Sequence, residues 1–336
     1  MSKGQNEIQS LCAVYKDYFP IGAAISSKRL TKYNVLLKRH FNSVTPENAL
    51  KMINIYKGSD EYSFEEMDQI VQYAKNNDMQ IRGHVLIWHS QAADSFFEKE
   101  NGESVSREML LKQMQEYIRQ IVGRYKKDIY CWDVVNEAID DSDDVFFRET
   151  KWRTIIGDDY IEKAFRFAHN EAPDALLFYN DYNYAVENKR EKLYKLIKSL
   201  MERDVPIHGI GIQGHWGLYH PDVSGIRRAI ELFANLGLQI QLTEMDMSMF
   251  AWEDRRTDLK QPTEDMLKRQ AEKYSRIFEI LREYTDVISG VTFWGVADDY
   301  TWLHDFPVEG RTNWPLLFDA DLKPKPAFDA ITSFEK

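Results

Sequence analysis

The chain has 336 residues, with 43 lysines and arginines against 54 aspartates and glutamates, and its formal net charge is −11. This acidic balance, without any run of basic residues, argues against nucleic acid and anionic membranes as partners, because both attract clustered cations. Hydrophobic residues make up 43% of the chain and charged residues 29%, which excludes an intrinsically disordered protein.

The cysteines and the N-terminal segment bear on location. Cys12 and Cys131 are too few for a disulfide framework and lie in no zinc-binding spacing, which favours a reducing compartment. The segment MSKGQNEIQSLCAVYKDYF lacks the pattern of a secretion signal, and no apolar run is long enough to span a membrane. We expect a cytoplasmic protein without membrane contact, and the sequence leaves monomer and homodimer open.

Short runs rich in Ile, Val, Leu and Phe alternate with longer segments of helical period, which predicts repeated strand-helix units. The predicted strands begin near Ile21, Phe41, Gln80, Ile129, Ala175, His208, Leu238 and Val287. Eight such units predict a single (β/α)8 TIM barrel spanning residues 1–336, of the α/β class. A doubly wound open sheet is the alternative, but no glycine-rich phosphate-binding turn follows any strand.

Three helices lie at particular places in this scheme. An extra N-terminal helix is expected from Asn6 to Phe19, ahead of the first strand. Ser63 followed by Glu66 predicts a capping box at the start of SFEEMDQIVQYAKNN. The tail KPKPAFDAITSF predicts a closing helix after a proline-stiffened turn.

Aromatic residues make up 13% of the chain, including 8 Trp and 18 Tyr, and several stand beside polar residues at the ends of apolar runs. A carbohydrate cleft has this composition, because sugar rings stack on aromatic faces while their hydroxyls need many hydrogen-bond partners. Packing in the core is the alternative for any single ring.

Polar residues at the carboxyl ends of strands are the candidates for function, because the active site of a TIM barrel lies there. These strand-end residues are Glu47, Asn48, His84, Trp88, His89, Gln91, Asn136, Glu137, Asn180, Asp181, Tyr182, Asn183, Gln213, His215, Trp216, Glu244, Asp246, Trp294, Asp298 and Trp302. Glu137 and Glu244 form the most informative pair, since two carboxylates beside a sugar oxygen are what glycoside hydrolysis requires. A salt-bridged structural residue is the alternative for either glutamate alone.

A metal site at these strand ends is the competing interpretation. His84 and His89 could bind a metal ion together with Glu47 or Asp246. The chain, however, has no H-E-x-x-H motif and no pair of histidines four residues apart. We therefore expect neither a metal nor a cofactor.

Seven segments carry a family resemblance. In chain order they are FNSVTPEN, RGHVLIWHSQ, WDVVNEA, LFYNDYN, GIGIQGHW, LTEMD and VTFWGVADDYTWL. They resemble the motifs of family-ten glycoside hydrolases, the endo-β-1,4-xylanases, over a stretch from Phe41 to Leu303. The chain is most similar to the intracellular bacterial members of that family.

The resemblance implies a role for each matching residue. Glu137 would be the general acid/base and Glu244 the nucleophile of a retaining reaction on xylan fragments and xylo-oligosaccharides. His215 would hydrogen-bond Glu244, Asp246 would orient His215, and Asn136 would hold the 2-hydroxyl of the sugar at the cleavage point. The substrate-binding residues implied in the same way are Glu47, Asn48, Lys51, His84, Trp88, Gln91, Tyr182, Gln213, Trp294 and Trp302.

The chain departs from the family pattern in two places. Ala93 and Ser95 follow Gln91 where the family usually has a proline and a tryptophan, and Ile53 stands where an acidic residue is common. Both changes affect the outer part of the cleft on the glycone side, the side of the sugar chain that ends in the cleaved anomeric carbon. A catalytically silent sugar-binding barrel, or side activity on β-1,4-glucans and cellobiosides, remains the alternative function.

Overall fold

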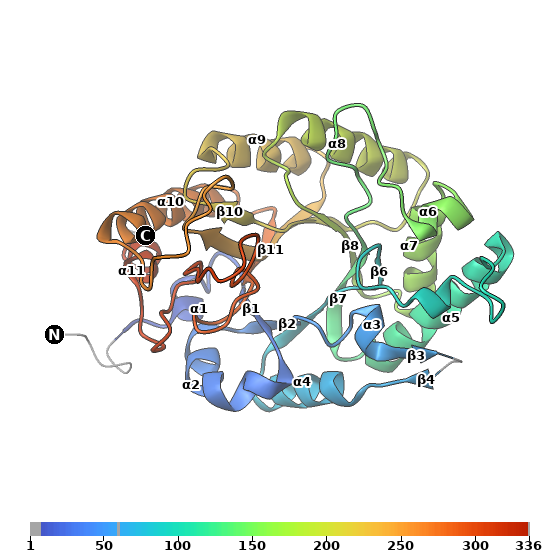
Figure 1. Ribbon diagram of the computed structural model, residues 1–336, viewed down its shortest axis with the longest axis horizontal. Coiled ribbons are helices and arrows are strands. Elements are labelled where there is room, and N and C mark those ends of the chain that lie inside the picture. Colours follow the sequence, from blue (N-terminus) through green and yellow to red (C-terminus); the bar gives the residue numbers. More distant parts are fainter. Residues whose placement is uncertain (1–7, 59–60, 335–336) are drawn as a thin grey trace.

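The computed structural model describes residues 8–58 and 61–334. Eight parallel strands form a closed barrel, and helices surround it (Figure 1). In barrel order the strands are β1 (Ile21–Ile25), β2 (Ser43–Pro46), β5 (Gln80–Gly83), β7 (Ile129–Asn136), β8 (Leu176–Asp181), β9 (Gly209–Ile212), β11 (Gln239–Ser248) and β12 (Ile288–Phe293). Pairing of β12 with β1 closes the barrel, with Ile21 opposite Val291. The predicted (β/α)8 barrel is therefore confirmed.

The remaining strands are short. β6 (Ile87–Trp88) pairs with the end of β7, and β10 (His215–Gly217) pairs with β11. Both carry residues of the predicted site at the carboxyl end of the barrel. β3 (Tyr56–Gly58) and β4 (Glu61–Tyr62) form a separate antiparallel pair.

The helices that cover the barrel are amphipathic, and their buried stripes pack on the strands. The longer helices are α2 (Leu30–His40), α4 (Glu65–Asn76), α5 (Arg107–Tyr125), α7 (Tyr160–Glu171), α8 (Glu187–Glu202), α9 (Val223–Ala234) and α10 (Glu264–Glu283). The shorter ones are α1 (Leu11–Val14), α3 (Met52–Ile55), α6 (Lys151–Ile156), α11 (Pro326–Thr332), and the 3-10 turns η1 (Ser27–Arg29) and η2 (Asp94–Phe96). Side-chain caps start several of them: Ser106 accepts from Met109 N at 3.2 Å and Thr263 from Met266 N at 3.2 Å.

Two details of the sequence prediction are wrong. The N-terminal helix is a single turn, α1, and Asn6 lies outside the described residues. The predicted capping box does not form, because α4 begins after Phe64 and the N–H of Ser63 donates to Ile55 O, at 2.8 Å, where the β3–β4 pair closes. Glu66 instead accepts a hydrogen bond from Ser26 at 3.1 Å. The closing helix is confirmed as α11.

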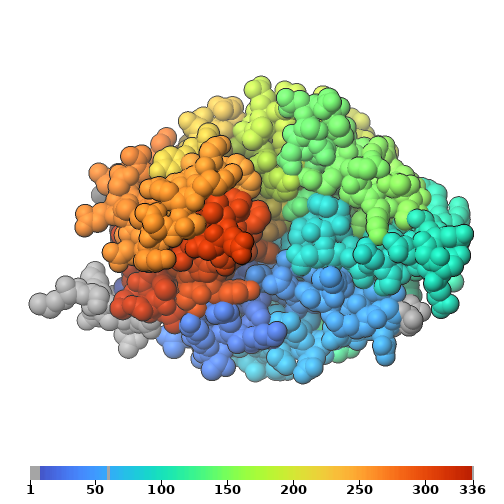
Figure 2. All heavy atoms as spheres, viewed as in Figure 1, coloured from blue at the N-terminus to red at the C-terminus, as the bar shows by residue number. Residues whose placement is uncertain are grey.

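The N-terminal and C-terminal segments meet at one side of the barrel. The Tyr15 hydroxyl donates to Ile331 O at 2.6 Å, and its ring lies 5.5 Å from the ring of Phe334. On the face shown in Figure 2, segments from the early, middle and late parts of the chain adjoin one another. The fold thus assembles this face from segments far apart in sequence.

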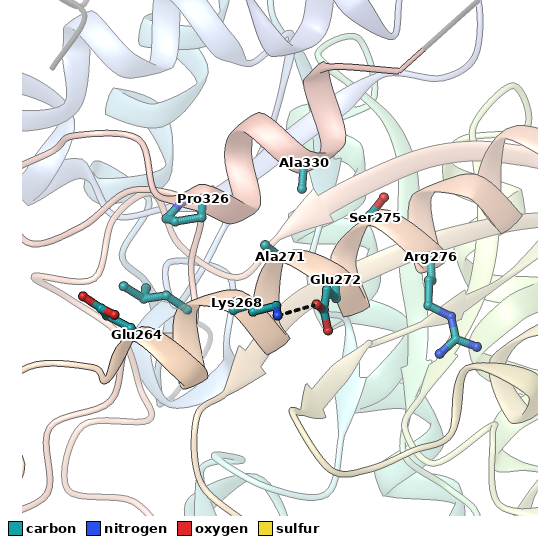
Figure 3. A pocket seen from close by; sticks show the side chains of 9 residues that line it. Glu264, Lys268, Ala271, Glu272, Ser275, Arg276, Pro326 and Ala330 are labelled. Atoms are coloured by element: carbon teal, nitrogen blue, oxygen red, sulfur yellow. Dashed lines mark ion pairs between the residues drawn. The ribbon is translucent and has the colours of Figure 1, made fainter. Parts of the chain in front are cut away.

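A groove of about 730 Å³ lies outside the barrel, between α10 and α11 (Figure 3). Leu267, Ala271, Pro326 and Ala330 give it a largely apolar lining, and the Lys268–Glu272 ion pair, 3.9 Å long, lies along α10. None of the strand-end residues lines this groove. Among the described residues, no helix combines the length and apolar composition that a bilayer crossing requires.

Candidate active site

Glu137 directly follows β7, and its backbone has a left-handed φ of 57°. A non-glycine residue in this region is uncommon and has to be held by its surroundings. Two hydrogen bonds hold it: Glu137 N donates to Asn180 O at 2.9 Å, and Ala138 N donates to the Tyr179 hydroxyl at 2.9 Å. Tyr179 in turn donates to the buried carboxylate of Asp181 at 2.6 Å.

Three side chains donate to the Glu137 carboxylate. Trp88 Nε1 lies 2.8 Å from Oε2, while Asn136 Nδ2 and Gln213 Nε2 lie 3.0 and 2.9 Å from Oε1. Burial raises the pKa of Glu137 above its usual range, and the negative charges of Asp181 and Glu244 add to the rise. These two effects outweigh the hydrogen bonds, so Glu137 is biased toward its protonated form.

Glu244 lies on β11, and its pKa is shifted downward, opposite to that of Glu137. Asn180 Nδ2 donates to its Oε1 at 2.7 Å, and His215 Nε2 lies 3.2 Å from its Oε2. Burial alone would raise the pKa of Glu244, but the attraction of His84 and His215 and the hydrogen bonds lower it to about 2. Glu244 is therefore an ionised carboxylate near neutral pH.

His215 bridges two carboxylates. Its Nδ1 lies 3.0 Å from Asp246 Oδ2, opposite the contact with Glu244. Burial opposes the charge on this ring, yet Asp246 and Glu244 raise the pKa of His215 to about 10. Trp302 Nε1 also donates to Asp246 Oδ2, at 2.7 Å. Both ring nitrogens of His215 thus face acceptors, which suits the imidazolium form.

A row of amides joins the two glutamates. Asn180 Nδ2 donates to Asn136 Oδ1 at 2.8 Å as well as to Glu244, and Thr243 Oγ1 donates to Asn180 Oδ1 at 2.7 Å. Asn136 reaches Glu137 through its own Nδ2. The amide row fixes the relative positions of the two carboxylates.

A buried charge cluster inside the barrel was not predicted from sequence. Arg82 and Asp133 form a bidentate ion pair, and Asp133 Oδ2 lies 2.8 Å from His84 Nδ1. The same His84 nitrogen lies 3.9 Å from Glu244 Oε1. Arg82 and Asp133 precede the strand ends by a few residues, so a rule that selects strand-end residues omits them. A charged residue inside an apolar run was the signal that could have found them.

Three of the predicted substrate-binding residues, Glu47, Asn48 and Lys51, follow β2. Buried Lys51 donates to Asn48 Oδ1 at 2.9 Å and lies 5.2 Å from the ring of Trp88. Burial lowers the pKa of Lys51, and the charges of Glu244, Glu47 and Glu137 oppose that shift. Burial raises the pKa of Glu47, which accepts a 3.4 Å hydrogen bond from Tyr300.

Gln91 differs from the other predicted residues. It is exposed and has a left-handed φ of 51°. Its carbonyl accepts from Ile53 N at 2.9 Å, but no described residue hydrogen-bonds its side chain. The structure therefore does not join the side chain of Gln91 to the glutamates.

The predicted aromatic residues lie on two sides. Trp294 is buried, with its ring 5.1 Å from that of His84, whereas Trp302 is 37% exposed and lies 4.9 Å from His215. Tyr182 is apart from both, and its hydroxyl accepts from Arg148 Nη2 at 2.6 Å and donates to Asp141. Within residues 8–58 and 61–334, no three His, Cys, Asp or Glu side chains form a group that could hold a metal ion.

Comparisons with known proteins place this geometry in a family. The model of glycosyl hydrolase family 10 matches residues 10–334. The endo-1,4-beta-xylanase A of Caldicellulosiruptor saccharolyticus is 50% identical over 327 residues, which cover 97% of this chain and 96% of the relative. The crystal structure of a xylanase from Paenibacillus barcinonensis, complexed with a conduramine derivative, is 48% identical with a TM-score of 0.96 and covers 98% and 99% of the two chains.

Another solved structure is a mutant in complex with xylotriose. It is 47% identical, with a TM-score of 0.95, over 97% of this chain and all of the other. The match of the family model along nearly the whole chain, together with these relatives, establishes that the chain belongs to glycosyl hydrolase family 10.

Proposed function

We propose that the protein is a retaining endo-β-1,4-xylanase, which hydrolyses internal β-1,4-xylosidic bonds by double displacement. The observation that carries this proposal is that the pKa values of the two carboxyl groups are shifted in opposite directions. Glu137 has a raised pKa and Glu244 a lowered one, and they share one amide row. A proton donor beside an ionised nucleophile is the arrangement that glycosidic cleavage requires.

In the first step, the proton of Glu137 passes to the glycosidic oxygen as the bond from that oxygen to the anomeric carbon breaks. A carboxylate oxygen of Glu244 forms a bond to the anomeric carbon, which gives a glycosyl-enzyme ester. In the second step, Glu137 accepts a proton from water, the water oxygen bonds to the anomeric carbon, and the ester bond breaks to regenerate Glu244.

The other side chains position this pair. His215 and Asn180 donate to Glu244 and keep it ionised before the first step. Asp246 holds the orientation of His215. We assign Asn136 to the 2-hydroxyl of the sugar at the cleavage point, since its amide lies between the two glutamates. Trp294, Trp302 and Tyr182 would stack on sugar rings.

The xylanase relatives support a xylan-derived substrate. Three features, the change at Ala93 and Ser95, the exposed Gln91 and the expected cytoplasmic location, favour short xylo-oligosaccharides over insoluble xylan. The cytoplasmic location itself stays a prediction.

The deciding experiment assigns the two glutamates. Glu137→Ala should retain glycosylation by aryl xylobiosides with good leaving groups, and added azide should yield a β-glycosyl azide. Glu244→Ala should lose activity on all of these substrates. Glu279→Gln, an exposed change on α10, serves as the control and should behave as wild type.

Proton NMR of the anomer that forms first completes the test. A β-anomeric first product from xylotetraose supports retention, whereas an α-anomer overturns it. A β-glycosyl azide from Glu244→Ala, together with an α-glycosyl azide from Glu137→Ala, would reverse the two assignments.

A further inference from the structure

A second depression, of about 760 Å³, lies at the same end of the barrel as the two glutamates. Its lining includes Ser26 after β1, Asn48 after β2 and Tyr300 after β12. Glu66 of α4 also lines it. Asn48 is hydrogen-bonded to Lys51, so the depression begins where the glycone side of the site ends. A sugar chain that leaves the site on this side would pass over it.

The lining of this depression is basic. Its charged residues are Lys28, Arg29, Lys32, Lys57 and Glu66. Four cations against one carboxylate contrast with the net charge of −11 for the whole chain. A local positive field on an acidic protein is the electrostatic requirement for capturing an anionic group.

Two of these cations share one carboxylate, and the other two have no partner in the part of the chain that the structure describes. Arg29 Nη1 and Lys32 Nζ lie 3.3 and 2.6 Å from Asp299 Oδ2. Lys28 and Lys57 are exposed and have no hydrogen-bond or ion-pair partner among the described residues. The two lysines are therefore the groups that a ligand would meet first.

Direct contacts connect the depression with the reaction site. The guanidinium carbon of Arg29 lies 3.9 Å from the centre of the Tyr300 ring, and the Tyr300 hydroxyl donates to Glu47 at 3.4 Å. The charge of Glu47 acts on Lys51, and so do the charges of Glu137 and Glu244. A ligand held in the depression would be continuous with a sugar chain in the site.

We propose that this depression binds a carboxylate carried by a sugar substituent on the glycone side of the substrate, so that the enzyme prefers oligosaccharides bearing an acidic sugar there. This inference rests on the proposed xylanase function and specifies its substrate class. Lys28 and Lys57 supply the charge, and the polar side chains of Ser26 and Asn48 supply hydrogen-bond partners for the hydroxyls.

The exposure of Lys28 and Lys57 limits how much they can raise kcat/KM for the acidic substrate. Exposed ion pairs are weak and screened by salt, so two of them together should raise kcat/KM about three- to tenfold at low ionic strength. The gain should appear mainly in KM, because the depression is remote from the bonds that change.

The test compares three xylo-oligosaccharides of equal length. The first carries one glucuronic acid substituent on the glycone side, the second carries the carboxyl-reduced, neutral form of that substituent, and the third carries the acid on the opposite, aglycone side. Each is assayed with wild type, with Lys28→Gln/Lys57→Gln, and with Lys198→Gln, an exposed lysine of α8, as the matched control.

A preference for the glycone-side acid over its neutral form, lost in the double variant and with added NaCl but kept in Lys198→Gln, supports the proposal. Equal kcat/KM for the acidic and neutral forms, or a preference that survives the double variant, overturns it.

Failure of the proposed function gives a separate result. If wild type does not cleave unsubstituted xylotetraose, the xylanase proposal fails, regardless of the results with the acid-substituted oligosaccharides. The charge proposal is then decided by calorimetric binding of the acidic and neutral oligosaccharides to wild type and to the double variant. Tighter binding of the acidic form that depends on the lysines supports it, and equal binding overturns it.

Discussion

Gly211 on β9 lies directly against the amide of Asn180: a Cβ at position 211 would lie 2.1 Å from Asn180 Oδ1. Asn180 is the side chain that donates to both Asn136 and Glu244. The absence of a side chain at 211 is therefore what allows the amide row to reach both catalytic candidates.

Gly211→Ala should lower kcat by about tenfold or more, because displacing the Asn180 amide removes a charge-assisted hydrogen bond from Glu244. No group that touches the substrate is replaced. The measurement is kcat per folded enzyme, with the folded fraction taken from circular dichroism. Gly123→Ala, where the nearest atom to an added Cβ is Glu171 Oε2 at 3.8 Å, is the control. An unchanged kcat in folded Gly211→Ala would contradict this role of Asn180.

The pH profile of kcat/KM should fall on its alkaline side as Glu137 loses its proton. The pKa of Glu137 is raised, so the proton needed for the first step is retained above the usual range of a glutamate and lost as the pH rises through the shifted value. The pKa of Glu244 is about 2, so the protonation of the nucleophile should limit activity only in strong acid.

Asp181→Asn should move that alkaline limb to lower pH. Asp181 is buried, and its charge raises the pKa of Glu137; its partner Lys189, at 3.2 Å, would then remain without this counter-charge. Tyr179→Phe removes the acceptor for Ala138 N but retains the Asp181 charge, so it should lower kcat with a smaller shift of the limb. An alkaline limb that stays in place in Asp181→Asn would refute the electrostatic link.

Stability should decrease in mild acid because of His40. This ring is fully buried between Phe318 and Phe328, and burial lowers its pKa from 6.5 to about 4. The unfolded chain binds a proton at His40 below pH 6.5 while the folded chain does not, so stability is lost as the pH falls from 6.5 toward 4. The full loss from this site is on the order of 3 kcal/mol.

Urea unfolding at pH 7 and pH 4.5 measures this effect. His40→Asn keeps an acceptor for Leu11 N, which donates to His40 Nδ1 at 3.3 Å, and does not titrate in this range. The variant should be less stable at pH 7, and its stability should change less with pH. His169→Asn is the control. A slope as steep as that of wild type would show that His40 does not govern the acid limb.

The value of kcat/KM should depend steeply on the length of the oligosaccharide, but only for short oligosaccharides. We expect kcat/KM to rise up to about xylotriose or xylotetraose and then to level off, with stacking on Trp302 contributing about 1 kcal/mol. Trp302→Phe keeps a ring but loses the donor to Asp246, whereas Trp302→Ala loses both. A value that keeps rising through xylohexaose, with insoluble xylan cleaved as readily as oligomers, would exclude the short cleft.

The barrel was predictable because each strand is an apolar run and each run ends in polar residues. The predicted and observed strand starts differ by two residues at most, as at Phe41 and Ser43. The same rule identified Glu137, Glu244 and His215, whose side chains the structure brings together. Their catalytic roles stay proposals that the variants above test.

Other features depend on contacts that no local pattern encodes. Ser63 has the residue type of a helix cap, but its N–H is used by Ile55 in the β3–β4 pair. Arg82 and Asp133 find each other across neighbouring strands inside the barrel, and nothing in either strand specifies the other. The basic depression likewise collects residues from the first 66 positions and from Tyr300.

The seam where the barrel closes joins the two ends of the sequence. β1 pairs with β12, and Tyr15 donates to Ile331 across 316 positions. During synthesis from the N-terminus, β1 therefore has one edge without a partner until nearly the whole chain has emerged. Closing so long a loop is entropically costly and late, and an open strand edge invites pairing with other chains. Aggregation of nascent chains should for this reason be governed by the last strand to arrive, far in sequence from the edge that it protects.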